Sequence, residues 1–246
     1  MENNEKIVLV IGGSRGIGAG IVWRLAAKGF VVYFTYTKGK VAAEELETLV
    51  SANGRKAYSL QADATDQNAM KGIRDHLVKS FGKIDAIVNN AGVFETGTLG
   101  ELQKDSAVLD RMWEVNVLSM VRNMDAFTGD ISEGGRIVLI GSGAADRVGS
   151  GGVGDYAAGK AALAAYTRAW ARDLANRNIT VNIVQPGLIQ TDLVPKDREV
   201  VQKMSQPIPL KRLGTPDEIG NVVAFLVSEE ASYVTGAIIN VDGGLG

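Results

Sequence analysis

Residues 7–18 have the sequence IVLVIGGSRGIG, and this stretch decides the expected fold. Ile7–Ile11 is apolar at every position, as is typical of a strand buried on both faces of a parallel sheet. The turn Gly12–Gly18 follows at once and leads into the helix-forming segment AGIVWRLAAKG. Glycines permit such a turn and clear its backbone of side chains, while the helix N-terminus offers N–H groups to a phosphate. The stretch therefore predicts a nucleotide-binding strand-turn-helix unit, with a purely structural glycine turn as the alternative.

The rest of the chain alternates short apolar runs with longer amphipathic segments. The apolar runs are Ile7–Ile11, Val31–Thr35, Lys56–Leu60, Ile84–Asn89, Arg136–Ile140, Ile179–Val184 and Ala237–Val241. Strands that alternate with helices indicate βαβ units and a parallel sheet. The alternation is interrupted after the sixth run, and long loops inside domains are usually functional. We therefore expect one domain, residues 1–246, with a small substrate lid at about residues 188–213.

The composition excludes several classes of chemistry. The 246 residues include no cysteine and a single histidine, His76, so thiolate metal sites, a cysteine nucleophile and a histidine-rich metal site are excluded. His76 lies in a polar, helical segment, where we expect a solvated side chain. The net charge is −2 with interspersed signs, which does not suggest nucleic-acid binding. The first apolar run has only five residues, too few for a signal peptide or a membrane span, so we expect a cytoplasmic protein.

The end of the second apolar run bears on the choice of dinucleotide. NAD-binding sites of this kind usually carry an acidic residue there for the ribose 2′-hydroxyl. This chain has VVYFTYTKGK, with Thr37 and Lys38 in that region and the first carboxylate only at Glu44. Together with Arg15 in the glycine turn, these side chains suit a 2′-phosphate. We therefore expect NADP(H) rather than NAD(H), the alternative being that Lys38 is a solvated loop lysine.

Polar residues also follow the third and fourth apolar runs. Asp63 could accept a hydrogen bond from an adenine amino group, or it could cap the next helix. Asn89-Asn90-Ala91-Gly92 ends the fourth run, where small residues suit a ligand crevice at the carboxyl edge of a sheet.

A second group of polar residues suits proton transfer. Tyr156 and Lys160 are four residues apart in YAAGK, so in a helix they share one face. A nearby ammonium favours the phenolate and would lower the tyrosine pKa toward the working pH. Ser142, after the run RIVLIG, could hold a substrate carbonyl or belong to a turn. Asn116 lies in an apolar helical segment, either as a satisfied core amide or as part of a proton relay.

Taken in order, these residues resemble the compact, single-domain members of the short-chain dehydrogenase/reductase family. The resemblance covers essentially the whole chain and extends through Pro186-Gly187, Thr191 and the terminal segment VTGAIINVDGG. Within the family the chain resembles 3-oxoacyl-carrier-protein reductases, and it resembles cyclic-di-GMP-binding biofilm-dispersal proteins more closely still. It implies a doubly wound α/β sheet of seven parallel strands with helices on both faces, and usually a homotetramer or homodimer.

The resemblance also implies roles for individual residues. Tyr156 would be the general acid in reduction and the base in oxidation, Lys160 would bind the nicotinamide ribose, and Ser142 would position the carbonyl. Asn116 would hold a water that links Lys160 to solvent. The implied cofactor-binding residues are Gly12, Ser14, Arg15, Gly16, Ile17, Gly18, Thr37, Lys38, Asp63, Ala64, Asn90, Ala91, Gly92, Tyr156, Lys160, Pro186, Gly187, Ile189 and Thr191.

The sequence departs from the family pattern at three points. Ile11 stands where a structural threonine usually precedes the first glycine, so we expect the glycine turn to be fixed in another way. Gly159 replaces a common serine, and we expect it to let the nicotinamide or a substrate approach closely. Ser142 is one residue further from Tyr156 than in many members, and we expect that residue to bulge without moving Ser142.

Two functions follow as hypotheses. The first is an NADP(H)-dependent oxidoreductase that transfers hydride between nicotinamide and a carbonyl or alcohol substrate, a small molecule. The second is a binding or sensing module that holds NADP(H) and a cyclic dinucleotide, with Arg147 as a possible phosphate ligand. The complete Asn-Ser-Tyr-Lys set favours the enzyme.

Overall fold

The structure is a computed structural model that describes residues 5–100 and 106–246. Its seven strands form one sheet in the order β3-β2-β1-β4-β5-β6-β7, and every neighbouring pair is parallel. The strands are β1 (Ile7–Ile11), β2 (Val31–Tyr36), β3 (Ala57–Gln61), β4 (Ile84–Asn89), β5 (Ile131–Ile140), β6 (Thr180–Pro186) and β7 (Ile238–Val241). The chain direction across the sheet reverses between β1 and β4, which is where doubly wound folds bind ligands. The predicted fold class is confirmed.

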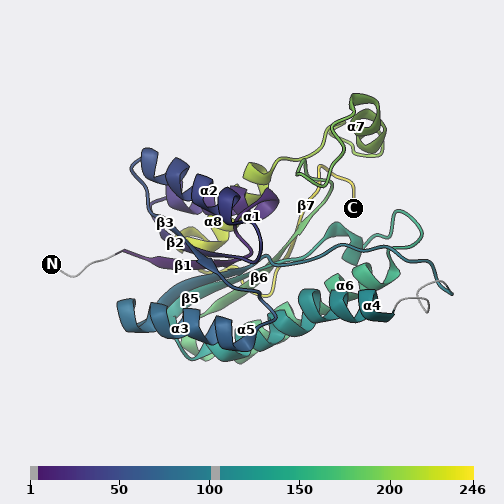
Figure 1. Ribbon diagram of the computed structural model, residues 1–246. Helices are drawn as coiled ribbons and strands as arrows, with labels where there is room; N and C mark the ends of the chain where they lie inside the picture. Colours follow the sequence, from purple (N-terminus) through teal and green to yellow (C-terminus); the bar gives the residue numbers. More distant parts are fainter. Residues whose placement is uncertain (1–4, 101–105) are drawn as a thin grey trace.

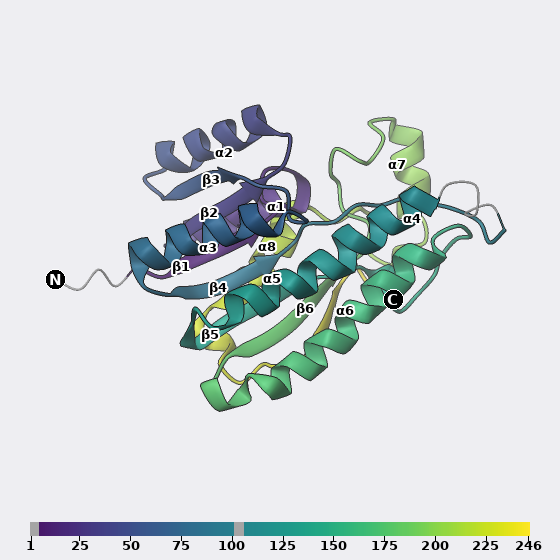
Figure 2. The ribbon, with the colours of Figure 1, turned by 60° about the horizontal axis from the view of Figure 1, so that its bottom comes forward.

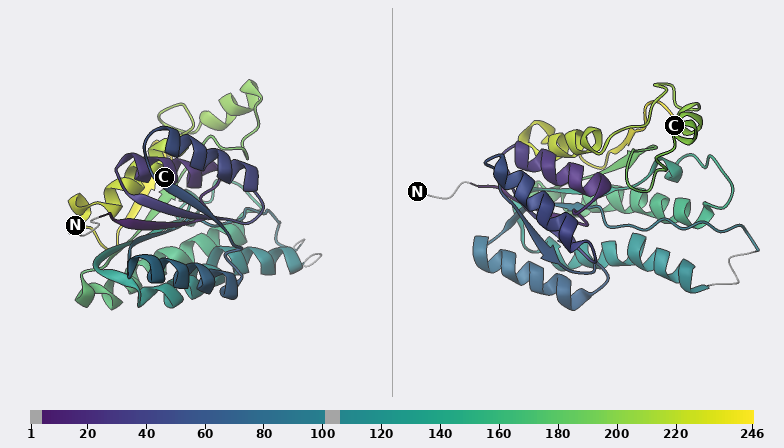
Figure 3. Two further views of the ribbon diagram at one scale, coloured as in Figure 1. Left: turned by 60° about the vertical axis from the view of Figure 1, so that its left-hand side comes forward. Right: turned by 45° about the horizontal axis from the view of Figure 1, so that its top comes forward.

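Helices cover both faces of the sheet (Figures 1 and 2). One layer consists of α1 (Gly16–Ala27), α2 (Lys40–Ala52) and α8 (Pro216–Val227). The other consists of α3 (Gln67–Phe81), α4 (Ser106–Trp113), α5 (Ser119–Thr128) and α6 (Gly154–Asp173). Helix α7 (Arg198–Ser205) belongs to neither layer and stands away from the sheet, beyond the carboxyl ends of the strands (Figure 3).

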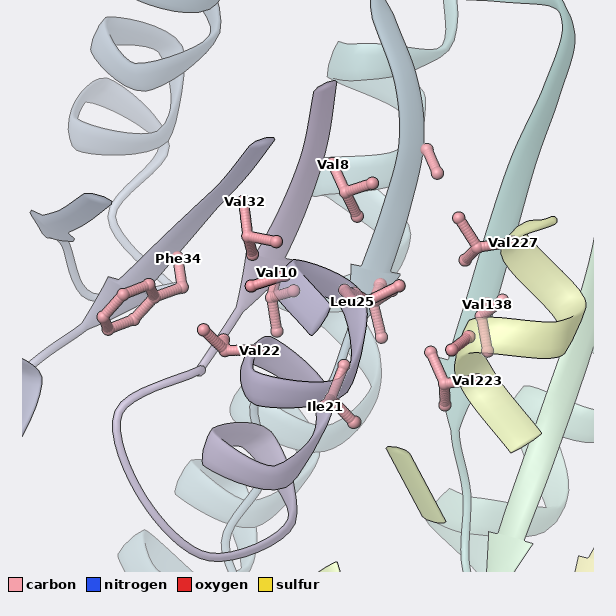
Figure 4. Packing of buried hydrophobic residues seen from close by; sticks show 14 of the residues in the cluster. Val8, Val10, Ile21, Val22, Leu25, Val32, Phe34, Val138, Val223 and Val227 are labelled. Carbon is pink, nitrogen blue, oxygen red and sulfur yellow. The ribbon is translucent and has the colours of Figure 1, made fainter. Parts of the chain in front are cut away.

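Each central strand contributes side chains to two separate cores. Val8 and Val10 of β1 point to the α1 and α8 side, where they join Leu25 and Val223 (Figure 4). Leu9 of the same strand points into the core beneath α3, α5 and α6. Burying one such side chain contributes about 1.5–3 kcal/mol, so both faces stabilise the strand. This two-sided burial explains why the first apolar run lacks alternation.

Strand β5 begins at Ile131, five residues before the run predicted for it. The added segment, ISEGG, has little strand character of its own. Ile131 is paired with Ile84 of β4, and the register then shifts before Arg136 pairs with Ala86. Pairing with a neighbouring strand therefore extends β5 beyond its local signal.

His76 is exposed on α3, as predicted, and its ring lies 6.2 Å from that of Tyr33. Within residues 5–100 and 106–246, we find no helix that combines the length and apolar character needed to cross a membrane.

Helices α1 and α8 approach closely because glycines face each other. A Cβ atom at Gly220 would lie 2.6 Å from the carbonyl oxygen of Gly20 and 2.8 Å from Cγ of Arg24. Arg24 also forms an ion pair with Asp217, with 2.6 Å between Nη2 and Oδ2. This contact holds α8 against the helix that follows the glycine turn.

We predict opposite effects of the same substitution at two helical glycines. Gly220→Ala should lower the free energy of unfolding by about 1–3 kcal/mol, because the methyl group overpacks the α1–α8 contact. Gly72→Ala, in α3, should raise it by up to about 1 kcal/mol, since no atom lies within 4 Å of the new Cβ. Urea unfolding of both variants checks this, and a stabilised Gly220→Ala would contradict the packing described.

Candidate active site

The glycine turn at the end of β1 is packed too closely for side chains. Gly12 has φ +83°, in the left-handed region that favours glycine. A Cβ atom at Gly13 would lie 2.5 Å from Cβ of Phe34, and one at Gly18 would overlap the carbonyl oxygen of Gly12. The turn is therefore a bare backbone surface at the switch point of the sheet.

Side chains of two neighbouring strands hold this turn. The N–H of Gly12 donates to Oγ1 of Thr35 at 2.9 Å, and the N–H of Gly13 donates to the Thr35 carbonyl at 2.9 Å. Nδ2 of Asn90 donates to the Gly12 carbonyl at 2.6 Å. The expectation that another group replaces the threonine missing at Ile11 is thereby confirmed: Thr35 and Asn90 do so.

Two substitutions of Thr35 distinguish the contribution of its hydroxyl group from that of its methyl group. Thr35 is buried, so Thr35→Val leaves the N–H of Gly12 without its acceptor and should cost about 1–3 kcal/mol of unfolding free energy. Thr35→Ser keeps the hydroxyl and should lose clearly less. Urea unfolding measures both; equal losses would mean that the methyl group, not the hydrogen bond, matters.

The N-terminus of α1 is open to an anion. Arg15 is the N-cap residue, and within the described chain no side chain caps the helix. The first-turn N–H groups of Gly16, Ile17 and Gly18 therefore face outward with the positive end of the helix dipole. The γ-methyl group of Thr191 lies 3.4 Å from the Cβ position of Gly16, which brings the segment after β6 to this turn.

Two exposed cations lie near this turn. Oγ of Ser14 is 3.5 Å from the Cβ position of Gly39, so the turn adjoins the residues that follow β2. Thr37 and Lys38 are exposed there, and Arg15 is exposed on the turn. Neither Arg15 nor Lys38 forms an ion pair with any residue that the structure describes. Hydroxyl and cationic donors thus share one corner of the site, as a 2′-phosphate requires.

Asp63 does not cap α3, so that interpretation is wrong. The N-cap is Asp66, whose side chain accepts from the N–H groups of Asn68 and Ala69. Oδ1 of Asp63 instead accepts from the backbone and hydroxyl of Thr65. Burial acts to raise the pKa of Asp63, but these bonds and Arg111, 3.5 Å away, hold it below its usual value. The next residue, Ala64, accepts from Nδ2 of Asn123 at 3.0 Å.

Asn116 lies in a π-helical turn (Glu114–Leu118) between α4 and α5. Its Oδ1 accepts from the N–H of Val93 at 2.8 Å, and its Nδ2 donates to the Val93 carbonyl at 2.8 Å. Of the two alternatives for Asn116, the satisfied amide therefore describes its side chain. Ala91 packs beside Gly12, and the Cβ position of Gly92 is 3.3 Å from Oδ1 of Asn116 and 3.5 Å from Nζ of Lys160.

Ser142, Tyr156 and Lys160 lie together. Tyr156 and Lys160 are on α6, with Nζ 5.8 Å from the centre of the tyrosine ring. The side chain of Ser142 lies close enough to Tyr156 to act on its pKa, and it accepts from the N–H of Ala144 at 3.2 Å. The longer loop thus leaves Ser142 within reach of Tyr156. Gly159, by contrast, faces Val117, 3.3 Å from its Cβ position, so its small size serves packing between helices.

The pKa of Tyr156 differs from the expected direction. Burial raises it, and the nearby Ser142 hydroxyl only partly opposes this. Burial also lowers the pKa of Lys160 to about 8. Nζ of Lys160 donates to the Ile140 carbonyl at 3.0 Å rather than to the phenol, so burial remains the largest influence on the tyrosine pKa. The phenol is therefore protonated at neutral pH.

The segment after β6 completes this edge. Pro186 ends the strand, and the N–H of Gly187 donates to the Val241 carbonyl at 3.1 Å. Ile189 pairs in parallel with Gly214, through bonds from Gln190 to Gly214 and from Gly214 to Leu188. In such a pairing, the N–H and C=O of Ile189 itself point away from Gly214. The backbone N–H and C=O of Ile189 therefore take no part in the bonds to Gly214, and they lie at the start of segment 188–213.

Two residues of this edge, Thr35 and Phe94, were not predicted. Thr35 anchors the glycine turn, and Phe94 packs its ring edge-to-face against Tyr156, with centroids 4.9 Å apart. Arg147, predicted as a possible phosphate ligand, donates to the Leu245 carbonyl. A buried threonine in a strand and an aromatic residue in a loop carry no spacing signal, so tertiary contacts alone identify them.

Comparison with known proteins agrees with this geometry. Residues 11–246 match the family described as enoyl-(acyl carrier protein) reductase. The chain is 39% identical over 241 residues to the cyclic-di-GMP-binding biofilm dispersal mediator protein of Escherichia coli K12, covering 98% of this chain and 97% of that protein. It is 38% identical over 249 residues to the 3-oxoacyl-acyl-carrier-protein reductase FabG of the same strain, covering 100% and 99%. A short chain dehydrogenase from Burkholderia cenocepacia J2315, crystallised with NADP, matches with TM-score 0.91 and 41% identity over 98% of this chain and 97% of that one.

A doubly wound sheet with a glycine turn at its switch point defines a Rossmann-type protein. The extent of these matches specifies the class further: the chain belongs to the short-chain dehydrogenase/reductase family. The resemblance inferred from the ordered motifs is thereby confirmed.

Proposed function

We propose that this protein is an NADP(H)-dependent oxidoreductase that transfers hydride between nicotinamide and a carbonyl or alcohol substrate. The observation that carries the proposal is the grouping of Ser142, Tyr156 and Lys160, with Nζ of Lys160 5.8 Å from the centre of the tyrosine ring, at the same sheet edge as the glycine turn. A protein that only binds a ligand has no need of this arrangement. The reductive direction fits a tyrosine whose raised pKa keeps it protonated.

The site fits NADP(H). The uncapped N-terminus of α1 and the bare turn Gly12–Gly18 suit the pyrophosphate, and Arg15, Thr37 and Lys38 suit the 2′-phosphate. A relative 41% identical to this chain was crystallised with NADP. When bound, the reduced nicotinamide supplies the hydride.

Further residues would hold the rest of the cofactor. Asp63 and Ala64 would border the adenine, and Asn90, Ala91 and Gly92 the adjoining ribose. The nicotinamide end would contact the residues after β6, with the free backbone groups of Ile189 and the side chain of Thr191 binding its carboxamide. The other residues expected to contact the cofactor are Ser14, Pro186 and Gly187.

The chain's own residues would carry the proton. Tyr156 donates its hydroxyl proton to the carbonyl oxygen during reduction and accepts a proton during oxidation. Ser142, next to Tyr156, would position the same oxygen. Lys160 would hold the nicotinamide ribose, and a water held by the backbone at Asn116, whose side chain is engaged with Val93, would link it to solvent. Segment 188–213 acts as a substrate lid on a single catalytic domain, 1–246.

The binding-module alternative rests on the 39% identity to a cyclic-di-GMP-binding protein. The bond from Arg147 to the Leu245 carbonyl weighs against it, because the guanidinium is engaged within the chain. Calorimetry with cyclic di-GMP separates the two: the reductase proposal expects no saturable heat at high micromolar ligand.

We also propose a cytoplasmic homotetramer, with a homodimer as the smaller alternative. Exposed apolar side chains on the outer helices and near β7 support an assembly, among them Leu118, Phe225 and Tyr233. Light scattering would show four times the chain mass of 26.0 kDa.

Removing one hydroxyl tests the proposed function. Tyr156→Phe should lower kcat/KM by about 100- to 10,000-fold in NADPH-dependent reduction of ketones and aldehydes, because the proton donor is lost. Tyr166→Phe is the matched control, since Tyr166 is on the same helix but packs against Trp170. Loss of NADPH absorbance measures both. Full turnover by Tyr156→Phe would disprove the assigned role.

A further inference from the structure

Phe94 lies directly beside the proposed proton donor. It follows Gly92 by two residues, and its ring meets that of Tyr156 at 85° with centroids 4.9 Å apart. Edge-to-face pairs of this kind contribute about 0.5–1.5 kcal/mol beyond their buried area. Phe94 is nevertheless 50% exposed, so one side contacts Tyr156 while the rest of the ring stays open.

The backbone on both sides of Phe94 is fixed. The preceding residue, Val93, is held by the two hydrogen bonds from Asn116. Three residues further on, the N–H of Gly97 donates to the carbonyl of Gly152 at 2.8 Å, in the loop between Ser142 and α6. The Phe94 ring is therefore a preformed wall of the site.

Other exposed apolar side chains occur on the loops that leave the same sheet edge. Val148 follows β5, and Leu193 and Leu210 lie in segment 188–213, with exposed fractions of 58%, 78% and 62%. Parallel strands place these loops together with the one that carries Phe94. Exposed apolar residues that gather on one part of a protein surface often mark a binding site.

Three cations on the loops after β5 and β6 are engaged within the chain. Arg147 donates to the Leu245 carbonyl, Nζ of Lys211 donates to the Gln206 carbonyl at 2.7 Å, and Arg212 binds both carboxylate oxygens of Glu218. The other charged residues of segment 188–213 balance in sign: Asp192, Lys196, Asp197, Arg198, Glu199 and Lys203. With Lys211 and Arg212 engaged and the other charges balanced, the segment carries no surplus positive charge to attract a substrate with a phosphate-bearing carrier.

We infer that Phe94 is a specificity residue that selects uncharged ketones or aldehydes with an aromatic or bulky apolar group next to the carbonyl. The open part of its ring packs against that group while Tyr156 and Ser142 bind the oxygen. The inference rests on the proposed reductase function. Bound NADPH would supply the hydride to the carbonyl carbon and leave as NADP⁺, while Tyr156 gives its proton to the oxygen and regains one from solvent, so that the substrate leaves as an alcohol.

Steady-state kinetics with NADPH and three probes test the inference: an aryl methyl ketone, a small aliphatic ketone and acetoacetyl coenzyme A. The wild type should prefer the aryl ketone over each other probe by at least tenfold in kcat/KM. Phe94→Ala should reduce the enzyme's preference for the aryl ketone over the aliphatic ketone at least tenfold, mainly by raising KM for the aryl ketone. Phe94→Leu should reduce that preference less, and Phe81→Ala, at the end of α3, should leave it unchanged.

The remaining outcomes separate the inference from the function beneath it. An equal loss on both ketones in Phe94→Ala would show that Phe94 only supports Tyr156, and a wild-type preference for the coenzyme A thioester would refute the substrate class. Either result would leave the reductase proposal intact. No turnover of any probe by the wild type would overturn the proposed function and this inference together.

Discussion

The residue Gly12 ties the three central strands together at the point where the sheet order reverses. Its N–H binds Thr35 at the end of β2, and its C=O binds Asn90 just beyond β4. Both bonds are short and both partners are fixed by their own strands. Because Gly12 also begins the turn into α1, the direction of that helix and its open N-terminus depend on these two bonds. The cofactor corner is thus set by backbone geometry before any ligand is present.

A second pair of hydrogen bonds fixes the backbone next to the proton-transfer residues. Asn116 holds Val93 by both its N–H and its C=O, and the π-helical turn places the asparagine opposite that backbone. π-Helical turns inside helices are frequent at functional sites. Gly92 on one side of Val93 leaves room for Lys160, and Phe94 on the other side meets Tyr156. One amide therefore positions the neighbours of both proton-transfer residues.

The sequence predicted the parts of the structure that have a local signal. β1 and β4 match their predicted runs, because most of their side chains are apolar and buried. β5 was predicted too short, because pairing with β4 recruits polar and glycine residues. Asp63 and Asp66 carry the same capping signal, and only the start of α3 decides between them. The direction of the Tyr156 pKa shift was predicted wrongly. It depends on whether burial of the phenol outweighs the Lys160 charge, and the sequence gives neither the depth of burial nor the distance to that charge.

The central claim is that this edge of the sheet binds NADP(H) for hydride transfer. Fluorescence titration of the purified protein with NADPH and with NADH tests it most directly. The account predicts at least tenfold tighter binding of NADPH, about 1.4 kcal/mol, from the donors at Arg15, Thr37 and Lys38. Equal binding of NADH would contradict the role of those donors, and no binding of either nucleotide would contradict the oxidoreductase account itself.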